Sequence, residues 1–225
     1  TITVNPTPTM DAPPNIEVCN GEDVTIDFTT DNTGGVTTYE WSAEGDPIGL
    51  DPTSGVVTDS DSDISFTASN IPPLANEPKE VIITVTPIFT NDGVSCTSDQ
   101  QQTFTIIVNP EPQIDDFAET ICEGDTFASI TPVNDTNGVV PSGTTYTWVI
   151  HDDSSPDVIG GSASTAPSAT IPGSELTLED DVTEPRDLIY RVTPNTEEGC
   201  EGEDFTVTIT VNPTPTMDAP PNIEV

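Results

Sequence analysis

The sequence predicts an all-β protein built from consecutive β-sandwich modules. Three observations lead to this prediction: short segments alternate apolar and polar residues with a period of two, helical patterns are scarce, and long stretches recur at a fixed spacing. Apolar residues make up only 32% of the chain, which also contains 23 prolines and 15 glycines. This composition favours short strands joined by turns over a helical bundle.

The recurrence is the strongest of the three observations. Residues 1–18 return letter for letter as residues 208–225, an offset of 207 residues (208 − 1). A divergent copy lies inside that period, because Val4–Pro6 recurs as Val108–Pro110 and again as Val211–Pro213. We therefore expect two homologous modules of about 104 residues (108 − 4) in a window of a longer tandem array. An engineered duplication of one flank would not explain the interior repeat.

The repeat also gives the expected module boundaries. We assign residues 1–5 to the last strand of a preceding repeat, 6–109 to the first module, 110–212 to the second module, and 213–225 to the first segment of the next repeat. The junction segments Asn5–Thr9 and Asn109–Pro112 alternate proline with polar residues, which favours an extended, semi-rigid backbone. The modules are expected to follow one another end to end.

Strands are expected where β-branched and aromatic residues alternate with polar ones. In chain order, the clearest segments are Val24–Phe28, Tyr39–Trp41, Ile82–Val85, Phe104–Val108, Tyr146–Trp148 and Phe205–Val211. Residues that favour turns, namely Gly, Asn, Asp and Pro, lie between them. Several short strands per module, separated by turns, are typical of an immunoglobulin-like sandwich of two sheets.

Each module carries one Tyr-x-Trp motif. A sandwich needs a large aromatic side chain between its sheets, and a residue that occurs once per module at the same place suits that role. The residues expected in the core are Tyr39, Trp41, Tyr146 and Trp148. The functional alternative is an aromatic platform that binds a sugar or a peptide.

Cysteines also occur twice per module. Cys19 and Cys96 are 77 residues apart (96 − 19), and Cys122 and Cys200 are 78 apart (200 − 122). The nearly equal spacing predicts one disulfide within each module and an oxidising, extracytoplasmic setting. Closing a loop of that length would stabilise a module by roughly 4 kcal/mol in the chain-entropy model. A rival pairing joins Cys96 to Cys122 across the junction and leaves the other two cysteines to partners outside the sequence.

The charge balance excludes two classes of partner. With 40 acidic and 3 basic residues, the formal net charge is −37. Nucleic acids and anionic membrane surfaces are bound through Lys and Arg, so neither is expected as a partner. The sequence has no 18-residue apolar run and no signal-peptide pattern, so no membrane insertion is expected in this segment. The acidic surface is expected to keep the chain soluble and extended by self-repulsion.

Calcium is the one cofactor that the sequence leaves open, because clustered carboxylates suit Ca²⁺. The candidate clusters are Asp31–Asn32, Asp59–Asp63, Asp115–Asp116, Asn134–Asp135 and Asp180–Asp181. The Asp59–Asp63 run has Ile64 and Asn70 where an EF-hand loop has its turn glycine and final glutamate. None of these clusters is specific for a metal, because 40 acidic residues in 225 produce such groups by chance.

Catalysis is not expected. His151 is the only histidine and has no counterpart in the first module, so a Ser-His-Asp or Cys-His site would leave the repeat unexplained. The sequence has no Cys-x-x-Cys pair to suggest a metal site and no glycine loop of the kind that holds phosphates. We therefore expect a protein that is not an enzyme.

The order of the repeated motifs resembles a known family. Cys-x-Gly-Glu/Asp, Tyr-x-Trp, Val-Thr-Pro and a closing Thr-Ile-x-Val-Asn-Pro follow one another in both modules. This order is similar to the PKD-like, immunoglobulin-type repeats of giant Bacteroidota cell-surface proteins, among them gliding-motility adhesins exported by type IX secretion. The family's Trp-Asp-Phe-Gly-Asp-Gly stretch is replaced here by Trp41–Asp46 and Trp148–Asp152.

The resemblance implies a structural role outside the cell. The chain would be a spacer repeat of a long extracellular adhesin or filament at the cell surface, holding a distal binding region away from the cell. Its partners would be the neighbouring repeats of the same chain. Two alternatives are a multivalent module that binds surface glycans or proteins, and a repeat that assembles with other copies into a surface fibre or sheath.

Overall fold

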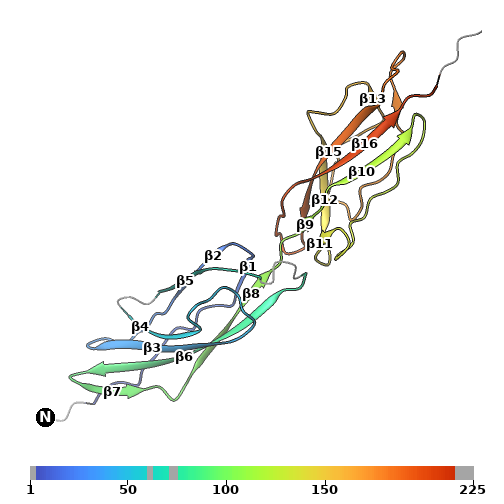
Figure 1. Ribbon diagram of the computed structural model, residues 1–225. Helices are drawn as coiled ribbons and strands as arrows, with labels where there is room; N and C mark the ends of the chain where they lie inside the picture. The colour runs from blue at the N-terminus through green and yellow to red at the C-terminus, as the bar shows by residue number, and fades with distance from the viewer. Residues whose placement is uncertain (1–3, 60–62, 71–75, 216–225) are drawn as a thin grey trace, which may run out of the picture. The chain divides into compact units, whose positions relative to one another are not determined.

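The computed structural model describes residues 4–59, 63–70 and 76–215. The chain divides into two compact units, Thr1–Glu111 and Pro112–Val225, and each is described separately. All regular elements in the described residues are β-strands (Figure 1), which confirms the all-β fold class. The same residues contain no helix that is long and apolar enough to cross a membrane.

The first unit consists of a large sheet and a small one. Its strands are β1 (Ile16–Cys19), β2 (Asp23–Asp27), β3 (Val36–Gly45), β4 (Ser54–Thr58), β5 (Asp63–Thr67), β6 (Lys79–Asn91), β7 (Val94–Thr97) and β8 (Gln102–Asn109). The large sheet has the order β1-β8-β6-β3-β4, with β7 paired to β6, and β2 pairs with β5 to form the small sheet. Strand β1 runs parallel to β8, whereas β6 is antiparallel to both β3 and β8.

The two sheets of the first unit enclose one apolar core. Along β6 every second side chain faces inward, so Val81, Ile83 and Val85 are buried. They pack in one cluster with Val24 and Ile26 of β2 from the opposite layer. Figure 1 shows β2 and β5 lying over one face of the large sheet. The alternation of apolar and polar residues in the sequence therefore separates the side chains that face the core from those that face solvent.

The second unit repeats this plan with a more irregular second layer. Its strands are β9 (Gln113–Ile114), β10 (Phe117–Cys122), β11 (Gly138–Val139), β12 (Thr145–Ile150), β13 (Val158–Ile159), β14 (Thr177–Leu178), β15 (Arg186–Asn195) and β16 (Phe205–Asn212). The main sheet has the order β10-β16-β15-β12. Short pairs and isolated bridges form the other layer, which contributes the buried side chains of Phe127, Ile171 and Leu176.

The main sheets of the two units have equivalent registers. Tyr39 lies opposite Pro87 in the first unit, and Tyr146 lies opposite Pro194 in the second. At the far end of the same strands, Lys79 lies opposite Val108 and Arg186 opposite Val211. The divergent sequence repeat is therefore a repeat of strand pairing.

Candidate functional sites at the ends of each unit

Each unit has two distinct ends, and all four cysteines lie at them. We call the end where the last strand finishes the trailing end, formed by Cys19–Glu22 with Asn109 in the first unit and Cys122–Asp125 with Asn212 in the second. We call the opposite end the leading end, formed by Asn91–Ser98 in the first unit and Asn195–Gly202 in the second.

At the trailing end of the first unit, the Cys-x-Gly-Glu motif forms a closed turn. Cys19 is the register partner of Asn109, the last residue of β8. Gly21 has a φ of 83°, a left-handed conformation that glycine adopts without strain. The Glu22 amide donates to the Cys19 carbonyl at 3.3 Å, and the Glu22 carboxylate accepts from the Cys19 amide at 2.8 Å. The motif thus fixes the direction in which the chain leaves β1.

The trailing end of the second unit has the same geometry. Cys122 is the register partner of Asn212, and Gly124 has a φ of 85°. The Asp125 amide donates to the Cys122 carbonyl at 3.0 Å, and the Asp125 carboxylate accepts from the Cys122 amide at 3.3 Å. The sequence showed this motif, and its role as a turn closed by a carboxylate could have been read from the glycine that precedes the acidic residue.

At the leading end of the first unit, Cys96 lies on the β6–β7 hairpin opposite Phe89. Asn5 contacts this hairpin: its Nδ2 donates to the Val94 carbonyl at 3.0 Å, and its Oδ1 accepts from the Asn91 side chain at 3.4 Å. A hollow of about 360 Å³ lies between them, lined by Val4, Asn5, Asn91, Asp92, Val94 and Cys96. The segment that precedes the first junction prolines is therefore attached beside Cys96.

The leading end of the second unit has the equivalent loop. The Cys200 amide donates to Thr196 Oγ1 at 3.1 Å, and two residues later the Gly202 amide donates to the Pro194 carbonyl at 3.0 Å. In the first unit, Ser98 donates to the Pro87 carbonyl at 3.0 Å, again two residues after a cysteine. Cys200 is thus the structural counterpart of Cys96.

The predicted disulfide within each module is wrong. Cys19 and Cys200 are disulfide-bonded, whereas Cys96 and Cys122 carry free thiols. In the first unit, ten residues of β6 separate Lys79 at the trailing end from Phe89 at the leading end, a length of about 33 Å at 3.3 Å per residue. A disulfide requires Cα atoms within about 7 Å of each other. Cys19 and Cys96 therefore lie too far apart to pair.

The same reason excludes the pair in the second unit. Nine residues of β15 separate Arg186, beside the trailing end, from Asn195 at the leading end, which is about 30 Å. The rival pairing of Cys96 with Cys122 is not formed either, because both thiols are free. Loop length in the sequence gave no information about which end of the sheet each cysteine occupies.

The four aromatic residues expected in the core are buried. Tyr39 and Tyr146 are 0% and 2% exposed, and Trp41 and Trp148 are 6% and 8% exposed. The Trp148 indole donates from Nε1 to the Ser162 carbonyl at 3.0 Å, so its one polar atom is satisfied inside the unit. Neither tryptophan presents the exposed face that an aromatic platform for a ligand requires.

Burial also sets the ionisation of the tyrosines. It raises the pKa of Tyr146 to about 12. Burial, followed by the carboxylates of Asp59 and Asp11, raises the pKa of Tyr39 to about 12. The pKa of Tyr190 is also raised by burial. These hydroxyls are protonated across the physiological range and belong to the core.

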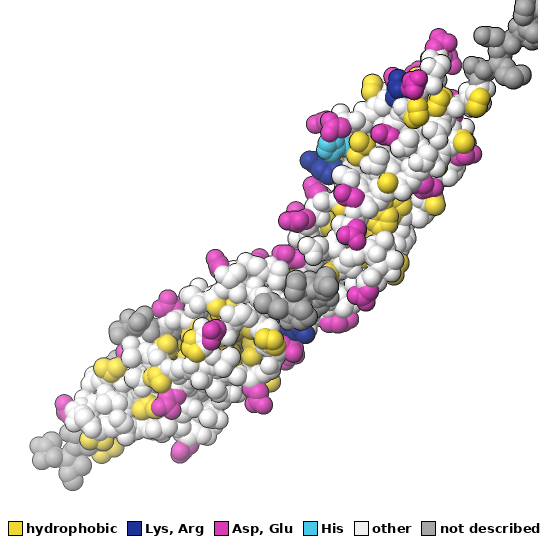
Figure 2. Space-filling view, viewed as in Figure 1, with side chains coloured by type: hydrophobic (Ala, Val, Ile, Leu, Met, Phe, Trp, Pro, Cys, Tyr) yellow, Lys and Arg dark blue, Asp and Glu magenta, His cyan; other side chains and the backbone are white. Residues whose placement is uncertain are grey.

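Acidic residues are spread over the surface. Figure 2 shows Asp and Glu side chains scattered across the visible face of both units. Within the described residues, no three His, Cys, Asp or Glu side chains gather as they would around a metal ion. Asp61 of the Asp59–Asp63 run lies outside those residues. His151 sits in a turn, where its Nδ1 accepts from the Asp153 amide at 3.1 Å.

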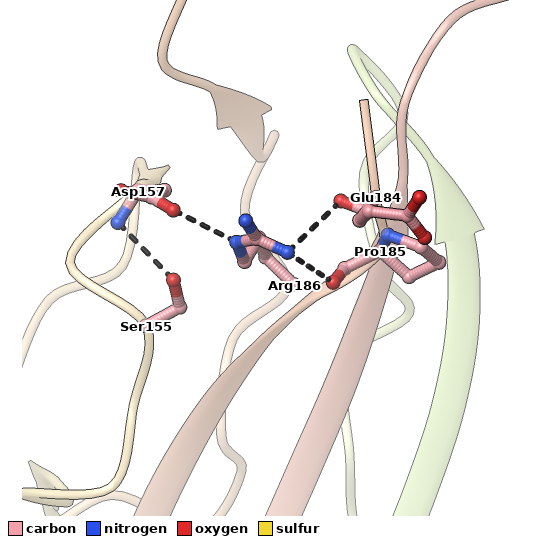
Figure 3. A network of polar contacts seen from close by, with 5 residues as sticks. All are labelled: Ser155, Asp157, Glu184, Pro185 and Arg186. Carbon is pink, nitrogen blue, oxygen red and sulfur yellow. Dashed lines mark hydrogen bonds and ion pairs between the residues drawn. The ribbon is translucent and has the colours of Figure 1, made fainter. Parts of the chain in front are cut away.

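One of the few cations organises a loop beside the trailing end of the second unit (Figure 3). Arg186 Nε donates to Asp157 Oδ2 at 2.8 Å, and its Nη1 donates to the Pro185 carbonyl at 3.1 Å. The Asp157 amide in turn donates to Ser155 Oγ at 3.3 Å. Both charged side chains remain about a third exposed, so solvent screens the pair. We read the pair as a loop anchor rather than a binding site.

Comparison with known proteins places this geometry in a class. Each unit is a β-sandwich domain of two packed layers, and the main sheets of the two units have equivalent registers. Residues 119–215 match the PKD-like domain family. No curated protein matches the chain.

Several solved structures are similar in fold at low identity. Fibronectin(III)-like modules of Clostridium thermocellum CbhA are 15% identical, with 92% of this chain and 95% of that chain covered and a TM-score of 0.34. The D00-D0 domain of Intimin is 15% identical, covering 91% and 98%, with a TM-score of 0.36. Chicken VE-cadherin EC1-2 is 15% identical, covering 89% and 98%, with a TM-score of 0.33.

Proposed function

We propose that this chain is a spacer segment of a long extracellular surface protein of the adhesin or filament type, which holds a distal binding region away from the cell. One observation carries the proposal: within each unit the chain arrives at the leading end and departs at the trailing end. A module with this arrangement adds its own length to an array. A module whose termini lay together would not.

The first unit supports this most clearly. Asn5 is attached to the β6–β7 hairpin through Val94 and Asn91, and Asn109 ends β8 one residue after Val108, which pairs with Lys79. Strand β6 connects these ends, and its 13 residues span about 40 Å at 3.3 Å per residue. Arrival and departure are therefore separated by the long dimension of the unit.

The second unit has the same polarity. A side chain on Gly202 would meet the Pro112 carbonyl, so the arriving chain passes against the leading end. The departing chain is attached at the trailing end, where the Thr214 amide donates to the Glu123 carboxylate at 3.2 Å. In both units, the residues that repeat in the sequence are used for packing and for these ends. This use fits a spacer, which needs copies of a module rather than one specialised site.

The finer assignment rests on the sequence resemblance. We propose that the parent protein is a Bacteroidota surface adhesin of the gliding-motility type, exported by type IX secretion, with its modules arranged end to end. The bonded cysteines are consistent with an oxidising location outside the cell. Neighbouring repeats would be the main partners, with other copies, surface glycans or surface proteins as further candidates.

Small-angle X-ray scattering tests directly whether added modules lengthen the molecule, as the spacer proposal requires. The chain is compared with a version lengthened by one period, in which residue 207 of one copy continues into residue 1 of the next and so reproduces the natural 207–208 junction. We expect the added pair of units to increase the maximum dimension by roughly 60–80 Å, from 30–40 Å of strand length per unit. An increase below about 20 Å would contradict the proposal, since a collapsed array gains volume rather than length.

The two alternative functions can be tested with the same two proteins, the chain and its lengthened version. Saturable binding to a glycan array or to whole cells, with tighter binding by the longer chain, would favour a multivalent binding module. Bundles in electron micrographs of the longer chain would favour a laterally assembled fibre or sheath. Isolated strings that bind no glycan support the spacer.

A further inference from the structure

The two free cysteines occupy the same two kinds of position as the two bonded ones. Cys122 is the counterpart of Cys19: each ends a strand parallel to the last strand of its unit, opposite the terminal asparagine. Cys96 is the counterpart of Cys200, two residues before the amide that binds the Thr-Pro carbonyl. Yet Cys19 and Cys200 are disulfide-bonded and Cys96 and Cys122 are free. Each kind of position therefore holds one bonded cysteine and one free cysteine.

Neither bonded cysteine pairs with the other cysteine of its own unit. The only other cysteine of the first unit is Cys96, and the only other cysteine of the second is Cys122, and both are free. The strand lengths given above exclude pairing within a unit for all four residues. A disulfide between the two cysteines of one unit is therefore excluded.

Contacts inside the first unit indicate what would approach Cys96. Val4 and Asn5 are the counterparts of Val108 and Asn109, so they correspond to the end of the last strand of a preceding module. Asn5 is hydrogen-bonded to Val94, two residues from Cys96, and lines the same hollow of about 360 Å³. A trailing-end cysteine is the register partner of that asparagine in both described units, one strand spacing of about 4.8 Å away. The trailing-end cysteine of a preceding module would thus lie beside Cys96.

The same argument applies to Cys122 and the module that would follow it. Its thiol is exposed and lies beside Asn212, the counterpart of Asn5. The Glu123 amide donates to the Asn212 carbonyl at 2.8 Å, which keeps the departing strand next to the cysteine. A following module that held Asn212 as the first unit holds Asn5 would bring its own leading-end cysteine to Cys122.

We propose that Cys96 and Cys122 are junction cysteines that crosslink consecutive modules. Cys96 bonds to the trailing-end cysteine of the module before it, and Cys122 to the leading-end cysteine of the module after it. In each reaction two S–H bonds break and one S–S bond forms. The two protons and two electrons pass to the disulfide of a thiol oxidoreductase or of oxidised glutathione, which becomes two thiols. This proposal does not depend on the adhesin assignment.

A thiol count on the lengthened chain tests the proposal. Each copy of the chain carries two free thiols. When residue 207 of one copy continues into residue 1 of the next, Cys122 of the first copy and Cys96 of the second flank the new junction. After folding in a glutathione redox buffer, the proposal gives two thiols reactive with Ellman's reagent in guanidinium, whereas independent cysteines give four. Peptide mapping without reduction should then recover the Cys122 peptide of the first copy linked to the Cys96 peptide of the second.

A matched pair of variants changes the count in opposite directions. Replacing Cys96→Ser in the second copy leaves the facing Cys122 without a partner, so the count rises from two to three. If the junction were not crosslinked, the same variant would lower the count from four to three. Cys96→Ser in the first copy is the control and should lower the count from two to one. A count of four in the unsubstituted chain with folded-state circular dichroism would overturn the proposal, as would a mapped Cys122 peptide that carries glutathione.

Discussion

The backbone of Cys19 and the side chain of Glu22 hold each other in a reciprocal turn. The Cys19 amide donates to the Glu22 carboxylate at 2.8 Å, while the Glu22 amide donates to the Cys19 carbonyl at 3.3 Å. Cys122 and Asp125 repeat the arrangement in the second unit. The acidic residue of the Cys-x-Gly-Glu/Asp motif is thus structural, and it orients the cysteine at the trailing end.

Removing this carboxylate should loosen the turn. Glu22→Ala leaves the Cys19 amide without its acceptor in an exposed position, so we expect a loss of about 1 kcal/mol in the free energy of unfolding. Glu22→Gln keeps an acceptor oxygen and should lose less than half of that. Urea unfolding followed by circular dichroism measures both. Equal losses for the two variants would show that the charge, rather than the hydrogen bond, stabilises the turn.

The Trp148 side chain should contribute more to stability than any surface feature. It is 8% exposed and its Nε1 is bonded to the Ser162 carbonyl, so Trp148→Ala should cost about 3–5 kcal/mol. Trp148→Phe keeps most of the apolar volume but loses the donor, and should cost about 1–2 kcal/mol. Both variants keep Trp41 as the only tryptophan, whose fluorescence reports on the first unit. An unchanged unfolding midpoint by circular dichroism for Trp148→Ala would contradict the core assignment.

Substitution of Gly202 should destabilise the second unit, because the backbone of Pro112 packs directly against this glycine. A Cβ at this position would meet the Pro112 backbone carbonyl, so Gly202→Ala must displace the arriving segment. We expect a loss of about 1–3 kcal/mol, typical of overpacking. Gly199→Asn is the control: its φ of 88° suits asparagine and nothing lies within 4 Å of an added Cβ. Thermal melts of the two variants should therefore differ by several degrees, and coincident melts would show that the Pro112 contact is dispensable.

Alkaline pH should destabilise both units through their buried tyrosines. Tyr39 and Tyr146 have pKa values raised from 10 to about 12, so the folded state keeps protons that the unfolded state loses. Their contribution is complete below pH 10 and is lost as the pH rises from 10 through 12. Tyrosinate absorbance at 295 nm should stay low up to about pH 11 and then increase together with the loss of circular dichroism. A smooth titration centred on pH 10, with the fold intact, would contradict this burial.

Much of the fold followed from local patterns. The alternation at Ile82–Val85 and Phe205–Val211 predicted strands that the structure contains, because inward and outward positions on a sheet depend only on the two-residue period. The Tyr-x-Trp motif lies on β3 and β12 with its aromatic residues buried, since both residues of the motif fall on the same face. The turn at Gly21 could also be read from the motif, because a glycine precedes the acidic residue that closes it.

The cysteines show where local patterns stop being informative. Nearly equal separations of Cys19 from Cys96 and of Cys122 from Cys200 reflect the repeat, and they suggested pairs that the strands hold about 30 Å apart. A sequence separation measures the length of a loop, whereas a disulfide depends on a distance in space. Only the register of β1 on β8 and of β7 on β6 assigns Cys19 and Cys96 to opposite ends of the first unit.

By itself, the order of amino acids determined that this is an all-β protein with an internal sequence repeat, because repeat, alternation and acidity can be read from the residues in order. The assembled sheets alone decided that every module has a leading and a trailing end with one cysteine at each. The reason is physical, because a strand of ten or more residues is about 30 Å long, so the cysteines at its two ends cannot reach each other.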